Sequence, residues 1–210
     1  MIEYNLKHWT KPFMLVWTGQ AVSILGTRLV NFAIIWWLTV ETKSASVLAV
    51  ASLMQILPQT LFSPFIGTLI DRWNRRITMI ATDVLNALAI LGLVFLFHLE
   101  SMETWHVFIW LLLRSFGDIT HGTAMTASTS LMVPKEQLTR ISGLNQALAG
   151  AGNIAGPLIG AVMIALFPIH TILLIDVITI IPAIIPILII SIPQPPQSAQ
   201  DNNKKGVIYE

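Results

Sequence analysis

Six long apolar runs, separated by short polar breaks, constrain this chain more than any other feature. A transmembrane helix needs about 20 mostly apolar residues, and each run is at least that long. Charged residues make up only 11% of the 210 residues, less than half of the roughly 25% found in soluble domains. We therefore predict an all-α integral membrane protein with six transmembrane spans. The predicted spans cover residues 13–39, 47–70, 77–97, 105–133, 137–167 and 170–192.

Basic residues gather on one side of the membrane if these spans alternate in direction. That side holds Lys7, Lys11, Arg72, Arg75, Arg76, Lys135, Arg140, Lys204 and Lys205. The opposite side holds only Lys43, together with Glu41, Glu100 and Glu103. Basic loops stay in the cytoplasm, so we expect both termini to be cytoplasmic. The tail, residues 193–210, is rich in Pro, Gln and Asn, a composition typical of a disordered segment.

Several classes of function find no support in the composition. The formal net charge is +1, which does not favour nucleic-acid binding. The chain has no cysteine, which excludes disulfides, thiolate metal sites and a cysteine nucleophile. We see no nucleophile–base pair or cluster of metal ligands, so we expect neither an enzyme nor a metal site.

Polar side chains recur at helical spacing inside the spans. Arg114, Asp118 and His121 lie at i, i+4 and i+7, so they share one face of a helix. Charges at membrane depth usually face a bundle interior or a wet cavity. Two interpretations remain open: Arg114 and Asp118 neutralise each other as a packing pair, or they line a translocation path in which Asp118 or His121 carries a proton. The first span offers Arg28 and Asn31 as further cavity candidates.

Two other intramembrane acids favour a structural role. Asp83 lies about two turns into the third span, where it could accept hydrogen bonds from the nearby arginines. Asp176 lies early in the sixth span, where it could cap a helix or pair near the outer surface.

The fifth span carries glycines every four residues, at Gly152, Gly156 and Gly160, with Pro157 beside the middle one. Small residues at this spacing let a neighbouring helix approach closely. The Gly-Pro pair predicts a local bend or loosening, and a role as a hinge is open.

A charged hairpin, GTLIDRWNRR, joins the second and third spans. It resembles the loop 2–3 signature of the major facilitator superfamily, and Asn74 stands where the family usually has Gly. Arg114 is similar to the family's mid-membrane arginine of span 4, although Gly117-Asp118 replaces the usual Gln-Gly. The span 5 glycines, with Gly143 before them, resemble the antiporter motif, whose final Gly is Ala161 here. The hairpin signature is matched at Gly67, Leu69, Asp71, Arg72, Arg75 and Arg76.

Three further segments resemble the bacterial macrolide-efflux and drug–proton antiporter branch. They are residues 17–34, residues 131–143 and residues 174–179, which include Asp176. The resemblance implies the N-terminal six-helix half, a 3+3 inverted repeat, of a twelve-helix transporter in the bacterial inner membrane. It implies efflux of an amphipathic, macrolide-like drug in exchange for protons, driven by the proton gradient without a cofactor. It also implies that the loop 2–3 motif is a conformational latch against the other half.

The expected partners are the lipid bilayer, a small amphipathic substrate, and a C-terminal half or a second copy of the chain. Two alternatives to autonomous transport stay open. The chain is a truncated fragment that does not transport, or a half-size subunit that acts as a homodimer.

Overall fold

A computed structural model describes residues 9–194 of the chain, and this part is built from α-helices, as predicted. Short turns and one 3-10 turn, η2 (Lys135–Gln137), connect the long helices. Each predicted span falls on one long helix. The helices are α1 (Thr10–Thr42), α2 (Ala45–Ile70), α3 (Arg75–His98), α4 (Thr104–Met132), α5 (Leu138–Leu166) and α6 (Ile169–Ile189).

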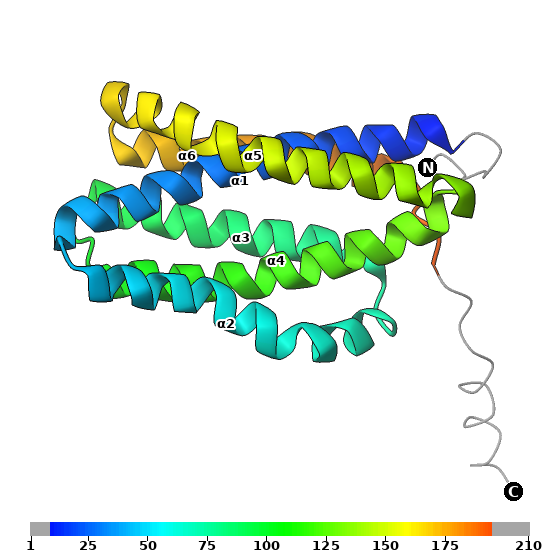
Figure 1. Cartoon of the computed structure of the whole chain (residues 1–210), viewed down its shortest axis with the longest axis horizontal. Coiled ribbons are helices and arrows are strands. Elements are labelled where there is room, and N and C mark those ends of the chain that lie inside the picture. Colours follow the sequence, from blue (N-terminus) through cyan, green and yellow to red (C-terminus); the bar gives the residue numbers. More distant parts are fainter. Residues whose placement is uncertain (1–8, 195–210) are drawn as a thin grey trace, which may run out of the picture.

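Five of these helices, all but α4, are long and apolar enough to cross a membrane by length and composition. Helix α4 is equally long. Arg114, Asp118 and many Ser, Thr and Gly residues lower its mean hydropathy. It nevertheless runs alongside the other helices in the bundle, with α2 and α3 packed against it (Figure 1).

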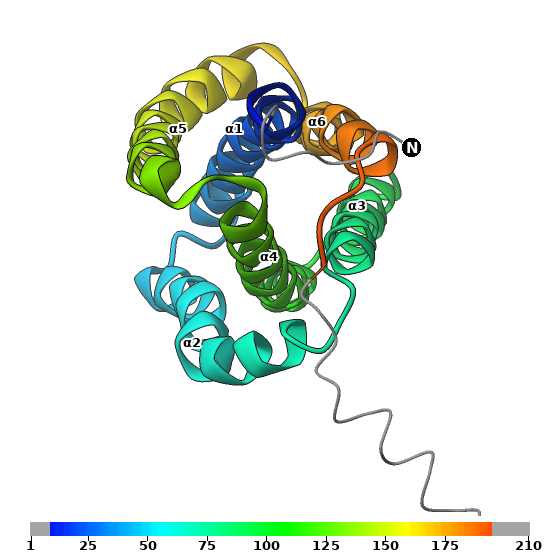
Figure 2. The ribbon, with the colours of Figure 1, turned by 90° about the vertical axis from the view of Figure 1, so that its right-hand side faces the viewer.

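The helices alternate in direction, so the described part begins and ends at the same end of the bundle (Figure 1). Helix α1 packs against α5 and α6, while α3 lies between α4 and α6 and α2 packs mainly on α4. Viewed along the bundle, these contacts leave α2 and α5 at its periphery (Figure 2).

Helix α2 is the least integrated of the six. Only Ala51, Pro58 and Ile70 are buried along its length. Pro58 and Pro64 lie inside the helix, and each removes a backbone donor and bends the axis. The second half of α2 consequently swings away from α4 (Figure 1).

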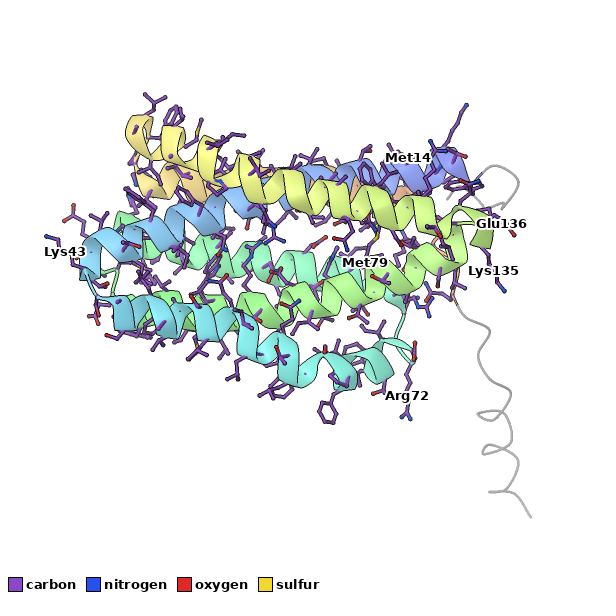
Figure 3. All side chains as sticks on the ribbon, viewed as in Figure 1. Met14, Lys43, Arg72, Met79, Lys135 and Glu136 are labelled. Atoms are coloured by element: carbon purple, nitrogen blue, oxygen red, sulfur yellow. The ribbon has the colours of Figure 1, made fainter. Side chains whose placement is uncertain are left out.

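Labelled charged residues lie at both ends of the bundle. Figure 3 shows Lys43 at one end, and Arg72, Lys135 and Glu136 at the other. Arg75, at the start of α3, belongs to that second end. Three of the basic residues counted in the sequence, Lys7, Lys204 and Lys205, lie outside the described residues, as does most of the 193–210 tail.

The apolar core has two separate parts with a polar layer between them. One cluster, toward the Lys43 end, includes Ile34, Leu38, Ile90 and Leu173. The other, toward the opposite end, surrounds Phe13 and includes residues of all the helices near that end. Between the clusters, α1, α2, α3 and α4 turn polar side chains toward the middle of the bundle, among them Gln20, Asp83 and Arg114, and this layer holds the candidate site.

Candidate functional site

A cavity of about 360 Å³ lies in the polar layer of the bundle. Helices α1, α2, α3, α4 and α6 contribute its walls, with a few apolar side chains such as Ile24 and Leu111 among the polar ones. The sequence-predicted candidates Arg28, Asn31, Arg114, Asp118 and His121 all line it, and so does Asp83. The other polar lining residues are Gln20, Ser23, Thr27, Gln55, Gln59, Asn86 and Ser115.

Arg114 is the hub of the cavity's hydrogen bonds. Its Nη1 lies 2.5 Å from Oδ2 of Asp176 on α6, and its Nη2 donates to the hydroxyl of Thr27 on α1 at 2.7 Å. The Thr27 hydroxyl donates in turn to Oδ1 of Asp176 at 2.8 Å. This closed triangle joins three helices. The guanidinium also lies over the ring of Trp110, with 5.3 Å between Cζ and the ring centroid.

Asp176 is fully buried. Its carboxylate points into the bundle, where it reaches Thr27 of α1 and Arg114 of α4, so it has a partner within the bundle and does not cap a helix. Both carboxylate oxygens have a donor, which offsets the desolvation of the charge.

Asp118 takes a looser position beside the same arginine. Its Oδ2 lies 3.8 Å from Arg114 Nε, and its side chain is 56% exposed. The expected i,i+4 contact therefore exists, but Asp176 is the closer partner of Arg114.

Asp83 and His121 form a second polar pair across the α3–α4 interface. Oδ1 of Asp83 lies 3.4 Å from Nε2 of His121. Asp83 therefore approaches a histidine of α4, a contact that differs from the expected one with the arginines at the start of α3.

Side-chain amides and a hydroxyl tie α2 into the cavity wall. Asn31 Nδ2 donates to Oε1 of Gln55 at 3.1 Å, and the Ser115 hydroxyl donates to the Gln55 carbonyl at 2.8 Å. Both bonds meet at one residue of α2, which anchors this otherwise exposed helix to α1 and α4.

Three glycines of the predicted motif bring α5 close to α1. A Cβ at Gly156 would lie 2.9 Å from the Arg28 Cβ, and one at Gly152 would lie 3.3 Å from the Arg28 Cγ. A Cβ at Gly160 would meet the Phe32 ring at 2.6 Å. Gly143 differs, because nothing lies within 4 Å of its Cβ position. Pro157 lies within the continuous helix α5.

Two arginines of the loop 2–3 motif donate hydrogen bonds to backbone carbonyls of other helices in this chain. Arg75 Nη1 donates to the Ala127 carbonyl of α4 at 2.8 Å. Arg76 donates through Nε to the Ile187 carbonyl at 2.8 Å, and through Nη2 to the carbonyl of Leu188. These bonds tie the start of α3 to α4 and to the last turn of α6.

The remaining motif residues are at the surface or near it. The Asp71 side chain is 74% exposed and lies 4.0 Å from Arg75. Leu69 is exposed, Arg72 projects from the turn (Figure 3), and nothing lies within 4 Å of the Cβ position of Gly67. Asn74, the departure from the family pattern, caps α3 by accepting a hydrogen bond from the Ile77 amide at 3.2 Å.

Sequence reasoning missed three close helix contacts. A Cβ at Gly19 would collide with the Pro182 carbonyl, and one at Gly26 with the Thr179 side chain, so both glycines allow α1 to approach α6. Gly117 likewise admits the Asn86 side chain of α3 against α4. The seven-residue spacing of Gly19 and Gly26 was the available signal.

Comparison with known proteins adds an independent line of information. The family model described as "Major Facilitator Superfamily" matches residues 16–208. The "Macrolide efflux protein A" of Streptococcus pyogenes is 38% identical over 194 residues, covering 92% of this chain and 47% of that protein.

Two further relatives match a similar share of the chain. The "Macrolide efflux protein A" of Enterococcus faecalis is 37% identical over 151 residues, or 72% of this chain and 46% of the relative. The "Multi-drug resistance efflux pump PmrA" of Streptococcus pneumoniae serotype 4 is 30% identical over 179 residues, or 83% of this chain and 42% of the pump. The chain spans about half the length of the curated relatives it matches.

Proposed function

This chain belongs to the major facilitator superfamily, and we propose that it forms the N-terminal six-helix half of a secondary transporter. The transporter exports an amphipathic, macrolide-like drug in exchange for protons by alternating access. The names of the efflux relatives support the direction and the substrate class, and the polar cavity supports a translocation path.

The observation that carries the proposal is the exposure of polar residues at mid-helix. Arg28, Gln59 and Asp118 are exposed, yet they lie near the middle of α1, α2 and α4, and Asp118 is the central residue of its helix. Charges at the bilayer centre cost about 2.5–3.5 kcal/mol each on insertion scales and face a bundle interior or water. A second six-helix unit over this face would enclose the groups and complete the cavity.

Alternating access needs a cavity that closes toward each side of the membrane in turn. The two apolar clusters lie toward the two ends of the bundle, with the polar layer between them. Rocking against a second half would open the path past one cluster while the other stays sealed. The exposed carboxylate of Asp71 is available to contact that half as a latch.

The lining of the cavity suits an amphipathic ligand. Amides of Asn31 and Gln59 and the charges of Arg28 and Asp118 offer polar contacts, while Ile24, Leu111 and Ile180 offer apolar ones. Drug-sized ligands bind in pockets of this mixed kind, which range from about 300 to 1,000 Å³.

The charge separation supports an inner-membrane protein with six spans, including α4, and with both termini in the cytoplasm. Apart from the mid-helix Arg28 and Arg114, the described arginines lie at the end that holds Arg72 and Lys135. The opposite end holds Lys43 and, at the two turns between helices there, Glu41, Glu100 and Glu103. Positive loops are retained on the cytoplasmic side.

Complementation tests the proposal directly. Efflux-deficient cells would express this chain alone, or together with the C-terminal half of the S. pyogenes relative, and erythromycin accumulation would be measured with and without a protonophore. We expect lower accumulation only with both halves, and loss of that difference when the protonophore is present. Unchanged accumulation despite membrane insertion of both halves would reject the transporter.

The same cells distinguish a half-size subunit that acts as a homodimer from a fragment that does not transport. Lower accumulation with the chain alone, together with a dimer in native mass spectrometry from lipid, would favour a homodimer. A monomer without any effect on accumulation, alone or paired, would favour a fragment that does not transport.

A further inference from the structure

We propose that Asp83 and His121 together form the proton-exchange site of the cavity. The inference rests on the proposed proton exchange and assigns it to one pair of residues. Sequence reasoning placed Asp83 among the structural acids and considered Asp118 or His121 as single titrating groups.

The two side chains lie close together in a buried place, where a shared proton would neutralise the pair. Nε2 of His121 lies 3.4 Å from Oδ1 of Asp83, and the side chains are 17% and 10% exposed. Neither this Nε2 nor the other carboxylate oxygen, Oδ2, has a hydrogen-bond partner within the described residues. An ionised carboxylate beside a neutral imidazole would stand uncompensated in a buried place, so one proton held between the two groups gives the pair zero net charge.

Asp176 and Asp118 both lie beside Arg114, a partner of fixed charge. Asp176 accepts from Arg114 and Thr27, and the guanidinium does not lose its proton in proteins. Asp118 is 56% exposed and lies beside the same arginine. Within the described residues, Asp83 is the one of these three acids with a histidine nitrogen within 4.0 Å, and the charge of a histidine side chain changes near neutral pH.

The charged groups that line the cavity near the pair come from α4 and α1. Helix α4 contributes Arg114 and Asp118, and α1 contributes Arg28. Asp176 of α6 is linked to this group through its bond to Arg114. Helix α2, which packs on the other side of α4, brings only the amides Gln55 and Gln59 to the cavity. Arg114 and Asp176 compensate each other, so gain or loss of the pair's one proton changes the charge at the α3–α4 interface by one unit.

The exchange step is a simple proton transfer. Water entering the cavity delivers a proton to the pair, which goes from one negative charge to zero, and water facing the other side later accepts the same proton. No covalent bond other than O–H or N–H forms or breaks.

The position of the pair connects this charge change to the loop 2–3 motif. Asp83 lies eight residues after Arg75, about 12 Å along α3 at 1.5 Å per residue. Arg75 bonds the same two helices through the Ala127 carbonyl. Gain or loss of the proton changes the attraction between α3 and α4 at the pair. The same two helices are joined by the Arg75–Ala127 hydrogen bond, so the change in attraction is transmitted to the loop 2–3 motif.

Spectroscopy of the full chain in lipid nanodiscs tests the pair without requiring transport. Infrared difference spectra would follow the carboxylic C=O band on acidification. Nitrogen NMR of labelled histidine would follow His121, identified among the five histidines by the His121→Gln variant. We expect Asp83→Asn to remove a C=O band and to displace the His121 titration by at least about one pH unit, the coupling that marks interacting sites.

The reciprocal variant, His121→Gln, should displace the Asp83 band by a similar amount, and Glu41→Gln at the exposed end of α1 should leave both signals in place. If only one of the two variants, Asp83→Asn or His121→Gln, folds, that variant alone tests the coupling. A signal unchanged by the loss of its partner, or a band that disappears in Asp118→Asn instead, would overturn the pair. If Asp83 and His121 titrate independently while the paired halves still export drug, only this inference is refuted. If the two titrations are coupled but the complementation test shows no efflux, only the proposed function is refuted.

Discussion

Replacement of Gly156 by alanine tests how closely α5 and α1 approach each other. An ideal Cβ at this position lies 2.9 Å from the Arg28 Cβ and 3.1 Å from the Arg28 carbonyl carbon. The second atom belongs to the backbone, so rotation of a side chain does not relieve the contact. The two helices have to separate, and overpacking of this kind costs about 1–3 kcal/mol.

The matched control is Gly150→Ala on the same helix. Nothing lies within 4 Å of its Cβ position, so alanine there adds only helix propensity, about 0.5–1 kcal/mol in favour of the fold. Both variants gain this propensity, and their difference isolates the helix contact. We expect Gly156→Ala to be about 1–3 kcal/mol less stable than Gly150→Ala.

Unfolding by SDS in mixed micelles measures this difference. Helical circular dichroism reports the unfolding of the whole bundle, including the α1–α5 contact at which the Trp17 indole donates to Asn145 at 2.7 Å. Equal stability of the two alanine variants would refute the close approach of the helices and the packing role of the glycine motif.

Three further substitutions address the polar contacts. Asp176→Asn leaves the buried guanidinium of Arg114 with only the exposed and more distant Asp118 as a charge partner. It should cost about 3–5 kcal/mol in the same SDS assay, and a loss below about 1 kcal/mol would contradict the buried pair. Asn74→Ala removes the cap of α3 and should cost about 0.5–2 kcal/mol, visible as a lower SDS midpoint, while an unchanged midpoint would argue against the cap. Asp71→Asn should change stability by less than about 0.5 kcal/mol but reduce efflux by the paired halves; full efflux would separate Asp71 from the proposed latch.

The positions of the helices follow closely from the sequence because each depends on local chemistry. The span predicted at 47–70 corresponds to α2 (Ala45–Ile70), and Ser44 supplies the cap that begins it. The span predicted at 170–192 is shorter in the structure, since α6 ends at Ile189. The polar faces of α1 and α4 likewise follow from helical periodicity, which places Asn31 and Arg114 in one cavity.

The partners across helices do not follow from the sequence. Asp176 and Arg114 are 62 positions apart, and their contact depends on the rotation of α6 about its own axis. Periodicity identifies a polar face but does not say which neighbouring helix it meets. The contact of Asp83 with His121 does not follow from the sequence for the same reason, because the sequence places Arg75 and Arg76 nearer to Asp83 than His121.

The contact of Arg76 with the end of α6 has a consequence for biosynthesis. Its Nε bonds to a carbonyl 111 residues later in the chain. At a synthesis rate of about 5–20 residues per second, on the order of 10 s passes before that carbonyl exists. During this interval α3 is already made, and the last turn of α6 gains these two donors only when it reaches α3. The arrival of α6 therefore closes this six-helix unit, and a chain truncated before Ile187 would lack both of these bonds.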